Sequence, residues 1–157
     1  MNSDLLSRLV IAPALSWLGP RYASPQAETM LIAIAWQESR LEHRVQMGGG
    51  PARGFWQFER EGGVRGVLRH HSSKLRAIEA CSDLVVEPTK EAVHTAIAQN
   101  DLLACIFARL LLFTDPYPLP TKEAEAWNYY ERNWRPGKPH PENWGESWDV
   151  ATREVYG

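Results

Sequence analysis

The sequence has no excess of basic residues. Its 17 Lys and Arg residues stand against 19 Asp and Glu, which gives a formal net charge of −2. A protein that binds nucleic acid usually carries a basic excess, because it must neutralise phosphates. The balance argues against a nucleic-acid partner, and so against a helical nucleic-acid module built on residues 64–74, where Arg, His and Lys gather.

Cysteine is scarce as well, with Cys81 and Cys105 as the only two. No CxxC pair occurs, and the set His70, His71, Cys81 and His94 matches no standard zinc spacing. We therefore expect no metal and no cofactor. A disulfide between the two cysteines is one alternative, but two buried free thiols are favoured.

Long hydrophobic runs are missing too. No apolar stretch reaches the roughly 18 residues that a membrane span needs. Near the N-terminus the apolar run is broken by Pro13, and Asp4 stands where a signal peptide would have basic residues. We expect an amphipathic helix there, synthesis in the cytoplasm without a signal peptide, and no membrane insertion.

The residues that are present predict a helical protein. The 157 residues, 44% hydrophobic and 23% charged, suit a single domain over residues 1–157 with one core. The fold class expected is mainly α, with at most a minor β-hairpin near residues 54–60. Capping residues, prolines and apolar periodicity place helices at about 3–18, 24–39, one or two within 63–84, 89–98, 101–113, 121–133 and 142–155.

One carboxylate ends an apolar helical face. Ala27, Leu31, Ile34 and Ala35 form a stripe on the helix predicted at 24–39, and Glu38 continues it. Desolvation on that face and the negative end of the helix dipole would both raise the pKa of Glu38. A carboxyl group that stays protonated near neutral pH can act as a general acid. The alternative is a solvent-facing Glu38 at a frayed helix end.

Two further segments accompany this glutamate. Glu38-Ser39 is followed, after a glycine-rich loop, by the run 51–57, Pro-Ala-Arg-Gly-Phe-Trp-Gln. A later helix contains 126–130, Ala-Trp-Asn-Tyr-Tyr. In this order and spacing the segments resemble the goose-type lysozyme and lytic transglycosylase family, part of the lysozyme-like superfamily. Pro51 and Phe55 replace a Gly and a Leu of the family pattern, and the third motif lacks its Ala-Gly end.

The resemblance implies a set of roles at a glycan groove. Glu38 would be the single catalytic acid and base, and Ser39 would orient it or the substrate. Gln57 would bind sugar, and Trp56 and Trp127 would line the groove, since indole faces stack on sugar rings. For Trp56, packing in the core is the equal alternative.

Two polar residues complete the expected site. Asn128 would donate or accept hydrogen bonds across it. Glu59 is a candidate second carboxylate, because extended-chain alternation places it on the same face as Gln57. If Glu59 is instead solvated, one glutamate remains for the chemistry.

The function implied is cleavage of the MurNAc–GlcNAc β-1,4 bond in peptidoglycan glycan strands by lytic transglycosylation. Two alternatives stay open: a two-carboxylate muramidase, and a catalytically silent lysozyme-like domain used for binding or assembly in a phage particle. Without a signal peptide, the protein would reach the cell wall by delivery or release, for example with a virion. The sequence leaves the oligomeric state open.

Overall fold

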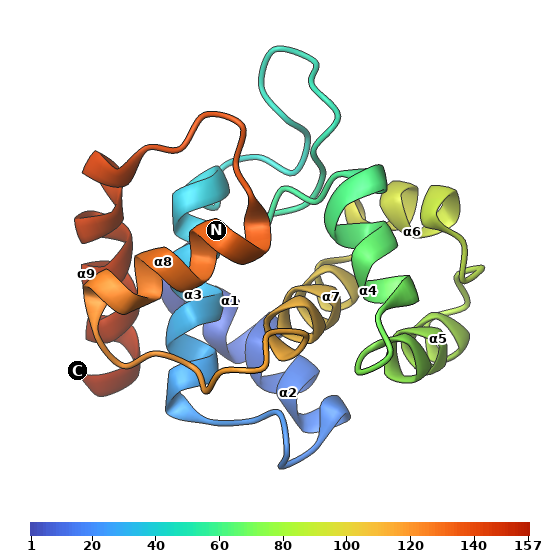
Figure 1. Ribbon diagram of the computed structural model, residues 1–157, viewed down its shortest axis with the longest axis horizontal. Helices are drawn as coiled ribbons and strands as arrows, with labels where there is room; N and C mark the ends of the chain where they lie inside the picture. Colours follow the sequence, from blue (N-terminus) through green and yellow to red (C-terminus); the bar gives the residue numbers. More distant parts are fainter.

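The computed structural model describes residues 1–157 and is built almost entirely of helices (Figure 1). Two isolated β-bridges, Val45–Arg53 and Arg53–Phe58, are the only strand-like pairing. The expected mainly α fold class is therefore confirmed, and the hairpin expected near 54–60 is reduced to these bridges. The α-helices are α1 (Ser3–Leu6), α2 (Ala12–Leu18), α3 (Pro25–Ser39), α4 (Arg65–Arg69), α5 (Lys74–Asp83), α6 (Lys90–Ile97), α7 (Asp101–Phe113), α8 (Glu123–Trp134) and α9 (Trp144–Tyr156).

The first three elements form one nearly continuous helix. A wider π-helical turn, Ser7–Ile11, joins α1 to α2. In this turn the backbone N–H of Ala12 donates to the carbonyl of Ser7, five residues earlier. Pro13 is the next residue and has no backbone N–H to donate. The widened turn therefore lies where the series of α-helical backbone hydrogen bonds would be interrupted. Asn2 caps the start by accepting from the N–H of Leu5.

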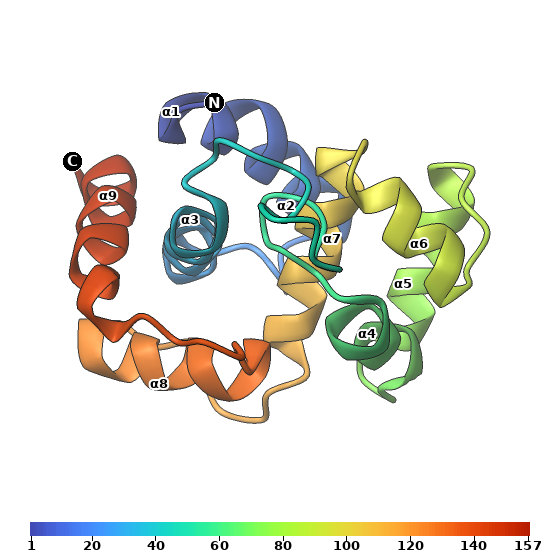
Figure 2. The same cartoon turned by 90° about the horizontal axis from the view of Figure 1, so that it is seen from above.

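Helix α3 runs through the middle of the molecule (Figure 2). Ser24 caps it by accepting from the N–H of Ala27, and Pro25 occupies the first helical position, where its missing N–H costs nothing. The apolar stripe predicted from the sequence was too narrow. Met30, Ile32 and Ala33, on other faces of the helix, have no exposed surface either. Helix α3 is thus buried on nearly every side, as a helix without a polar face must be.

Helix α7 is the second central helix. Asn100 caps it, and Leu103 to Leu112 are buried as a continuous run. The helices α4, α5 and α6 gather on one side of α7, while α8 and α9 lie on the other side, beside α3 (Figures 1 and 2). One core of 38 buried residues joins both sides. The two cysteines lie in it as free, buried thiols.

No single helix is long and apolar enough to cross a membrane. Helices α6 and α7 reach the length and composition only as a pair, and they meet at an angle of 119°.

Helix α8 is the element that brings the distant C-terminal region to the end of α3. It crosses α3, and α9 then returns along α3 on the outside (Figures 1 and 2). Two further short turns, Arg60–Val64 and Pro141–Asn143, lead into α4 and α9. The C-terminal end of α3 is therefore enclosed by segments about 100 residues later in the chain.

Candidate functional site

Glu38 occupies the last turn of α3, one residue before the helix ends. Arg40 and Leu41 follow with left-handed backbone conformations, at φ of 52° and 58°. Such conformations are disfavoured for residues with a Cβ, so other contacts must hold the turn. Ser39 does so, because its buried hydroxyl donates to the carbonyl of Ala35 and accepts from the N–H of Leu41. The direction in which the chain leaves Glu38 is thereby fixed.

The carboxylate of Glu38 has one hydrogen-bond partner in the chain. The hydroxyl of Tyr130, on α8, donates to Oε1 of Glu38 at 2.5 Å. Tyr130 is only 3% exposed. Burial and the nearby charge of Glu38 raise the pKa of Tyr130 above its usual range, so the phenol remains protonated and is the donor.

Burial dominates the ionisation of Glu38. Desolvation raises its pKa to about 7, although the hydrogen bond from Tyr130 acts in the opposite direction. The negative charge of Glu59 raises the pKa a little further. Glu38 therefore stays protonated to a higher pH than an ordinary glutamate, which suits a group that must first give and then take a proton.

Glu59 itself is exposed on the surface. Its effect on Glu38 places the two carboxylates near each other. The extended chain assumed in the alternation argument is absent, because residues 54–57 form a turn in which Gln57 has a left-handed backbone. No hydrogen bond or ion pair holds the Glu59 side chain in one position. It is thus near the candidate acid but has no contacts that would orient it as a nucleophile or base.

A cluster of tryptophan rings packs around the ring of Tyr130. Its ring stacks on Trp144 of α9, with ring centres 5.2 Å apart and planes 10° apart. Trp127 packs against both rings, at 5.4 and 5.7 Å. Trp134, one turn further along α8, donates its indole N–H to the carbonyl of Trp56. The cluster fixes α8 on the end of α3 and leaves Trp127 half-buried.

Trp56 does not line a groove. It has no exposed surface, and its indole N–H donates to the carbonyl of Leu31 in the middle of α3. The groove role expected for this residue is wrong, and the alternative of core packing is what the structure has. Its bond to α3 and the bond that its carbonyl accepts from Trp134 of α8 hold this residue in the core.

The side chains of Ser39 and Gln57 form hydrogen bonds mainly with backbone groups of the turns in which they lie. Ser39 is 2% exposed and bonds backbone groups, so it orients the chain at Glu38 rather than a substrate. Gln57 has a left-handed backbone, and its side-chain Nε2 donates to the carbonyl of Gly54. Gly54 is required there, since its φ is +77° and a Cβ would lie 2.7 Å from Ile97. Gln57 is half-buried, and its side-chain oxygen has no partner within the chain.

Asn128 faces away from Glu38. It is exposed and lies with Glu125 and Arg132 beside the loop 117–121, on the outer side of α8. The role predicted for it across the site is wrong. One residue along a helix is a rotation of 100°, so Asn128 and Trp127 point in different directions.

Tyr130 is the site residue that the sequence reasoning missed. The signal was present, because Trp127, Tyr130 and Trp134 recur at i, i+3 and i+7 and so share one helical face. That face packs on α3, and it contains the residue that reaches Glu38.

No group of three or more His, Cys, Asp and Glu side chains lies close enough together to hold a metal ion. The site is a carboxyl group with a phenol donor and an aromatic wall. In comparisons with protein-family models, curated proteins and solved structures, nothing matches the chain. The resemblance to goose-type lysozymes and lytic transglycosylases therefore stays a prediction drawn from the motifs.

Proposed function

We propose that the protein cleaves the MurNAc–GlcNAc β-1,4 bond of peptidoglycan glycan strands, with Glu38 as the catalytic acid. The observation that carries this proposal is the partly buried Glu38 with its pKa raised to about 7, held by the hydroxyl of Tyr130. A glycosidic oxygen needs a proton before it can leave, and a carboxyl group still protonated near pH 7 supplies one.

The same residue serves both halves of the reaction. Glu38 first donates its proton to the leaving glycosidic oxygen as the C1–O bond breaks. The resulting carboxylate then takes the proton of the sugar's own 6-hydroxyl, whose oxygen attacks C1 and forms a 1,6-anhydro ring. No water is consumed. Tyr130 assists by donating to the carboxylate at the stage when it carries the charge.

A single well-positioned carboxyl group favours this transglycosylase course over hydrolysis. A hydrolase needs a second carboxylate, about 5–5.5 Å away as a nucleophile or about 6.5–9.5 Å away as a base. Glu59 is the candidate, but it is exposed and no contact orients it. A two-carboxylate muramidase is thus the second enzymatic proposal, and it depends on substrate ordering Glu59.

Digestion of purified sacculi followed by mass spectrometry tests the proposal. The expected products end in 1,6-anhydro-MurNAc, one water lighter than reducing ends, and Glu38→Gln is expected to release none. Products with reducing ends only, together with loss of activity in Glu59→Gln, would replace the transglycosylase by a hydrolase. Retention of more than about a tenth of the activity in Glu38→Gln would remove Glu38 from the mechanism.

A binding role without catalysis is the third candidate. It is favoured by the arrangement of the expected sugar contacts, since Trp56 is buried and Asn128 faces outward. A lysozyme-like domain that only binds or assembles, as in a phage particle, would bind chitooligosaccharides or a partner and release no fragments from sacculi. NMR titration with chitooligosaccharide beside the digestion separates the two.

A further inference from the structure

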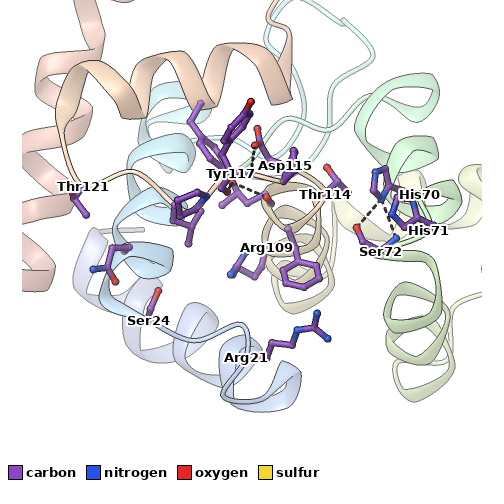
Figure 3. A pocket seen from close by; sticks show the side chains of 17 residues that line it. Arg21, Ser24, His70, His71, Ser72, Arg109, Thr114, Asp115, Tyr117 and Thr121 are labelled. Atoms are coloured by element: carbon purple, nitrogen blue, oxygen red, sulfur yellow. Dashed lines mark hydrogen bonds between the residues drawn. The ribbon is translucent and has the colours of Figure 1, made fainter.

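A cavity of about 960 Å³ lies at the start of α3, whereas Glu38 lies at its end. Figure 3 shows the side chains that line it. Ser24 and Gln26, at the start of α3, form part of its wall. Fourteen residues of helix, or about 21 Å, separate Ser24 from Glu38. The remaining wall comes from the end of α7, the loop 114–121 and the turn 70–72 before α5. The proposed glycan site does not account for this cavity.

A buried arginine forms one wall. Arg109, on α7, is 5% exposed and lines the cavity. Its Nε donates to the carbonyl of Tyr22 at 2.8 Å, but its two terminal nitrogens have no hydrogen-bond partner in the chain, and no carboxylate pairs with it. Burial without a counter-ion lowers the pKa of its guanidinium. These two nitrogens are not sealed from solvent, so they can donate to water or to a ligand in the cavity.

A second arginine reaches the same cavity. Arg21 lies over the ring of Phe113 at 5.0 Å, and Arg109 lies 5.8 Å from the centre of that ring. Arg21 forms no ion pair within the chain. Figure 3 shows Arg109 in the midst of the lining side chains, with Arg21 beneath it. Two guanidinium groups near the same aromatic ring make the electrostatic potential of this part of the wall positive, which favours an anion there.

The only carboxylate in the wall is already neutralised. Asp115 accepts from Nε of Arg132 at 2.6 Å and from Asn133 at 2.8 Å, and its side chain is 3% exposed. It is thus turned toward α8 and does not compensate Arg109 or Arg21. The wall has an excess of positive charge, although the whole chain has a net charge of −2.

Uncharged donors add to this excess. The backbone N–H of Ser72 donates to Nδ1 of His70, so the ring proton of a neutral His70 is on Nε2, which can donate. Thr121 also lines the cavity, as do the rings of Phe113 and Tyr117. Polar donors are therefore combined with apolar ring surface, as in sites for small organic ligands.

We propose that this cavity binds a small organic anion, with its phosphate or carboxylate group on Arg109 and Arg21 and its apolar body on Phe113 and Tyr117. Arginine suits such groups because its planar fork makes two parallel hydrogen bonds to an oxyanion. The start of α3 adds the positive end of a 15-residue helix dipole to the same cavity.

Calorimetric titration of the whole protein with phenyl phosphate, benzoate and inorganic phosphate tests the proposal, with phenol as the uncharged comparison. The two organic anions are expected to bind, inorganic phosphate more weakly, and phenol not measurably. The stronger of phenyl phosphate and benzoate identifies the anionic group. Absence of binding by both organic anions at millimolar concentration would overturn the proposal.

Arg21→Gln is the first variant, since Arg21 is on the surface and its replacement should leave the fold intact. Loss of one charge-assisted contact predicts about tenfold weaker binding. Arg8→Gln, a matched loss of charge on an exposed arginine of the N-terminal helix, should bind like the wild type. Equal binding by Arg21→Gln and the wild type would place the ligand elsewhere.

Arg109→Lys tests the buried arginine. The substitution keeps the positive charge but removes the planar guanidinium group that makes two parallel hydrogen bonds. We expect a loss of tenfold or more in affinity. If this variant does not fold, chemical shifts of the Arg109 side-chain N–H in the wild type decide, because an anion in the cavity must move them. An unmoved signal under saturating ligand would exclude the site.

Discussion

Tyr130 and Glu38 are 92 residues apart in the chain, and their side chains meet in a hydrogen bond of 2.5 Å. The phenol donates to a carboxyl group whose pKa burial has already raised, so the two influences oppose each other. The hydrogen bond favours the charged form, and desolvation favours the neutral form. Desolvation prevails, and Glu38 titrates close to neutral pH.

Tyr130→Phe should raise the pKa of Glu38 further, because it removes the influence that lowers it. A hydrogen bond to a charged group contributes about 1.5–3 kcal/mol, equivalent to a shift of about one pH unit or more. Since a general acid works only while protonated, the alkaline fall in sacculus clearing should move to higher pH, with a lower maximal rate. Tyr156→Phe, on an exposed tyrosine, is the matched control. An unchanged pH profile in Tyr130→Phe would show that the hydrogen bond does not tune Glu38.

Glu38→Gln should stabilise the fold at alkaline pH. Below pH 4.5 the carboxyl is protonated in both the folded and the unfolded chain and has no differential effect. As the pH rises from 4.5 to about 7, the unfolded chain releases the proton and the folded chain retains it, so the free energy of unfolding falls. The loss approaches about 3 kcal/mol above pH 7.

Urea unfolding at pH 4.5 and pH 8 measures this difference. The variant and the wild type should be nearly equal at the lower pH, and the variant more stable at the higher one. Glu42→Gln, at an exposed glutamate four residues later, is the matched control. If the difference in the free energy of unfolding between wild type and Glu38→Gln is the same at both pH values, the pKa of Glu38 is not raised.

Glu59→Gln should lower the pKa of Glu38 slightly, since it removes a negative charge that raises it. The alkaline fall in activity should therefore move to slightly lower pH, and salt should screen the shift, because Glu59 is exposed. Under the single-carboxylate mechanism the activity near pH 6 should be retained. Loss of activity by a hundredfold would assign Glu59 a direct part in the chemistry.

Trp56→Phe should destabilise the fold without affecting glycan binding. The change removes the hydrogen bond to the carbonyl of Leu31 and leaves unfilled space in the core, at a cost of about 2 kcal/mol. Urea unfolding gives the cost, and NMR titration with chitooligosaccharide gives the affinity. Trp148→Phe, at a half-buried tryptophan, should cost less. A large loss of affinity in folded Trp56→Phe would restore this residue to the site.

The features that could be predicted from the sequence are those that depend on residues close together in the chain. Ser24 and Asn100 cap helices that begin where expected, because a cap bonds a backbone N–H only three residues away. The apolar residues on its own helix indicated a buried Glu38 as one of two interpretations, and this is the one that the structure has. These inferences needed no information about distant segments.

The partner of Glu38 depends on how α8 packs on α3, and nothing within either segment specifies that packing. The third motif lies on the helix that reaches Glu38, but Asn128 of that motif is on the outer side and Tyr130 is the residue in contact. The inward turn of Trp56 likewise depends on α3 and α8 together. The cavity at Arg109 was missed for the same reason, since its wall combines segments from Arg21 to Tyr129.

Because α3 is enclosed on nearly every side, its length fixes the distance and the rotation between the residues at its two ends. Adding one residue within it would turn everything beyond that point by 100° and advance it by 1.5 Å, which would carry Glu38 away from the phenol of Tyr130 and expose apolar side chains. The exposed glycines Gly48 and Gly49 lie in a surface loop, where extra residues meet no neighbour. Natural variation in chain length among proteins built this way should therefore occur in that loop, while α3 keeps its fifteen residues.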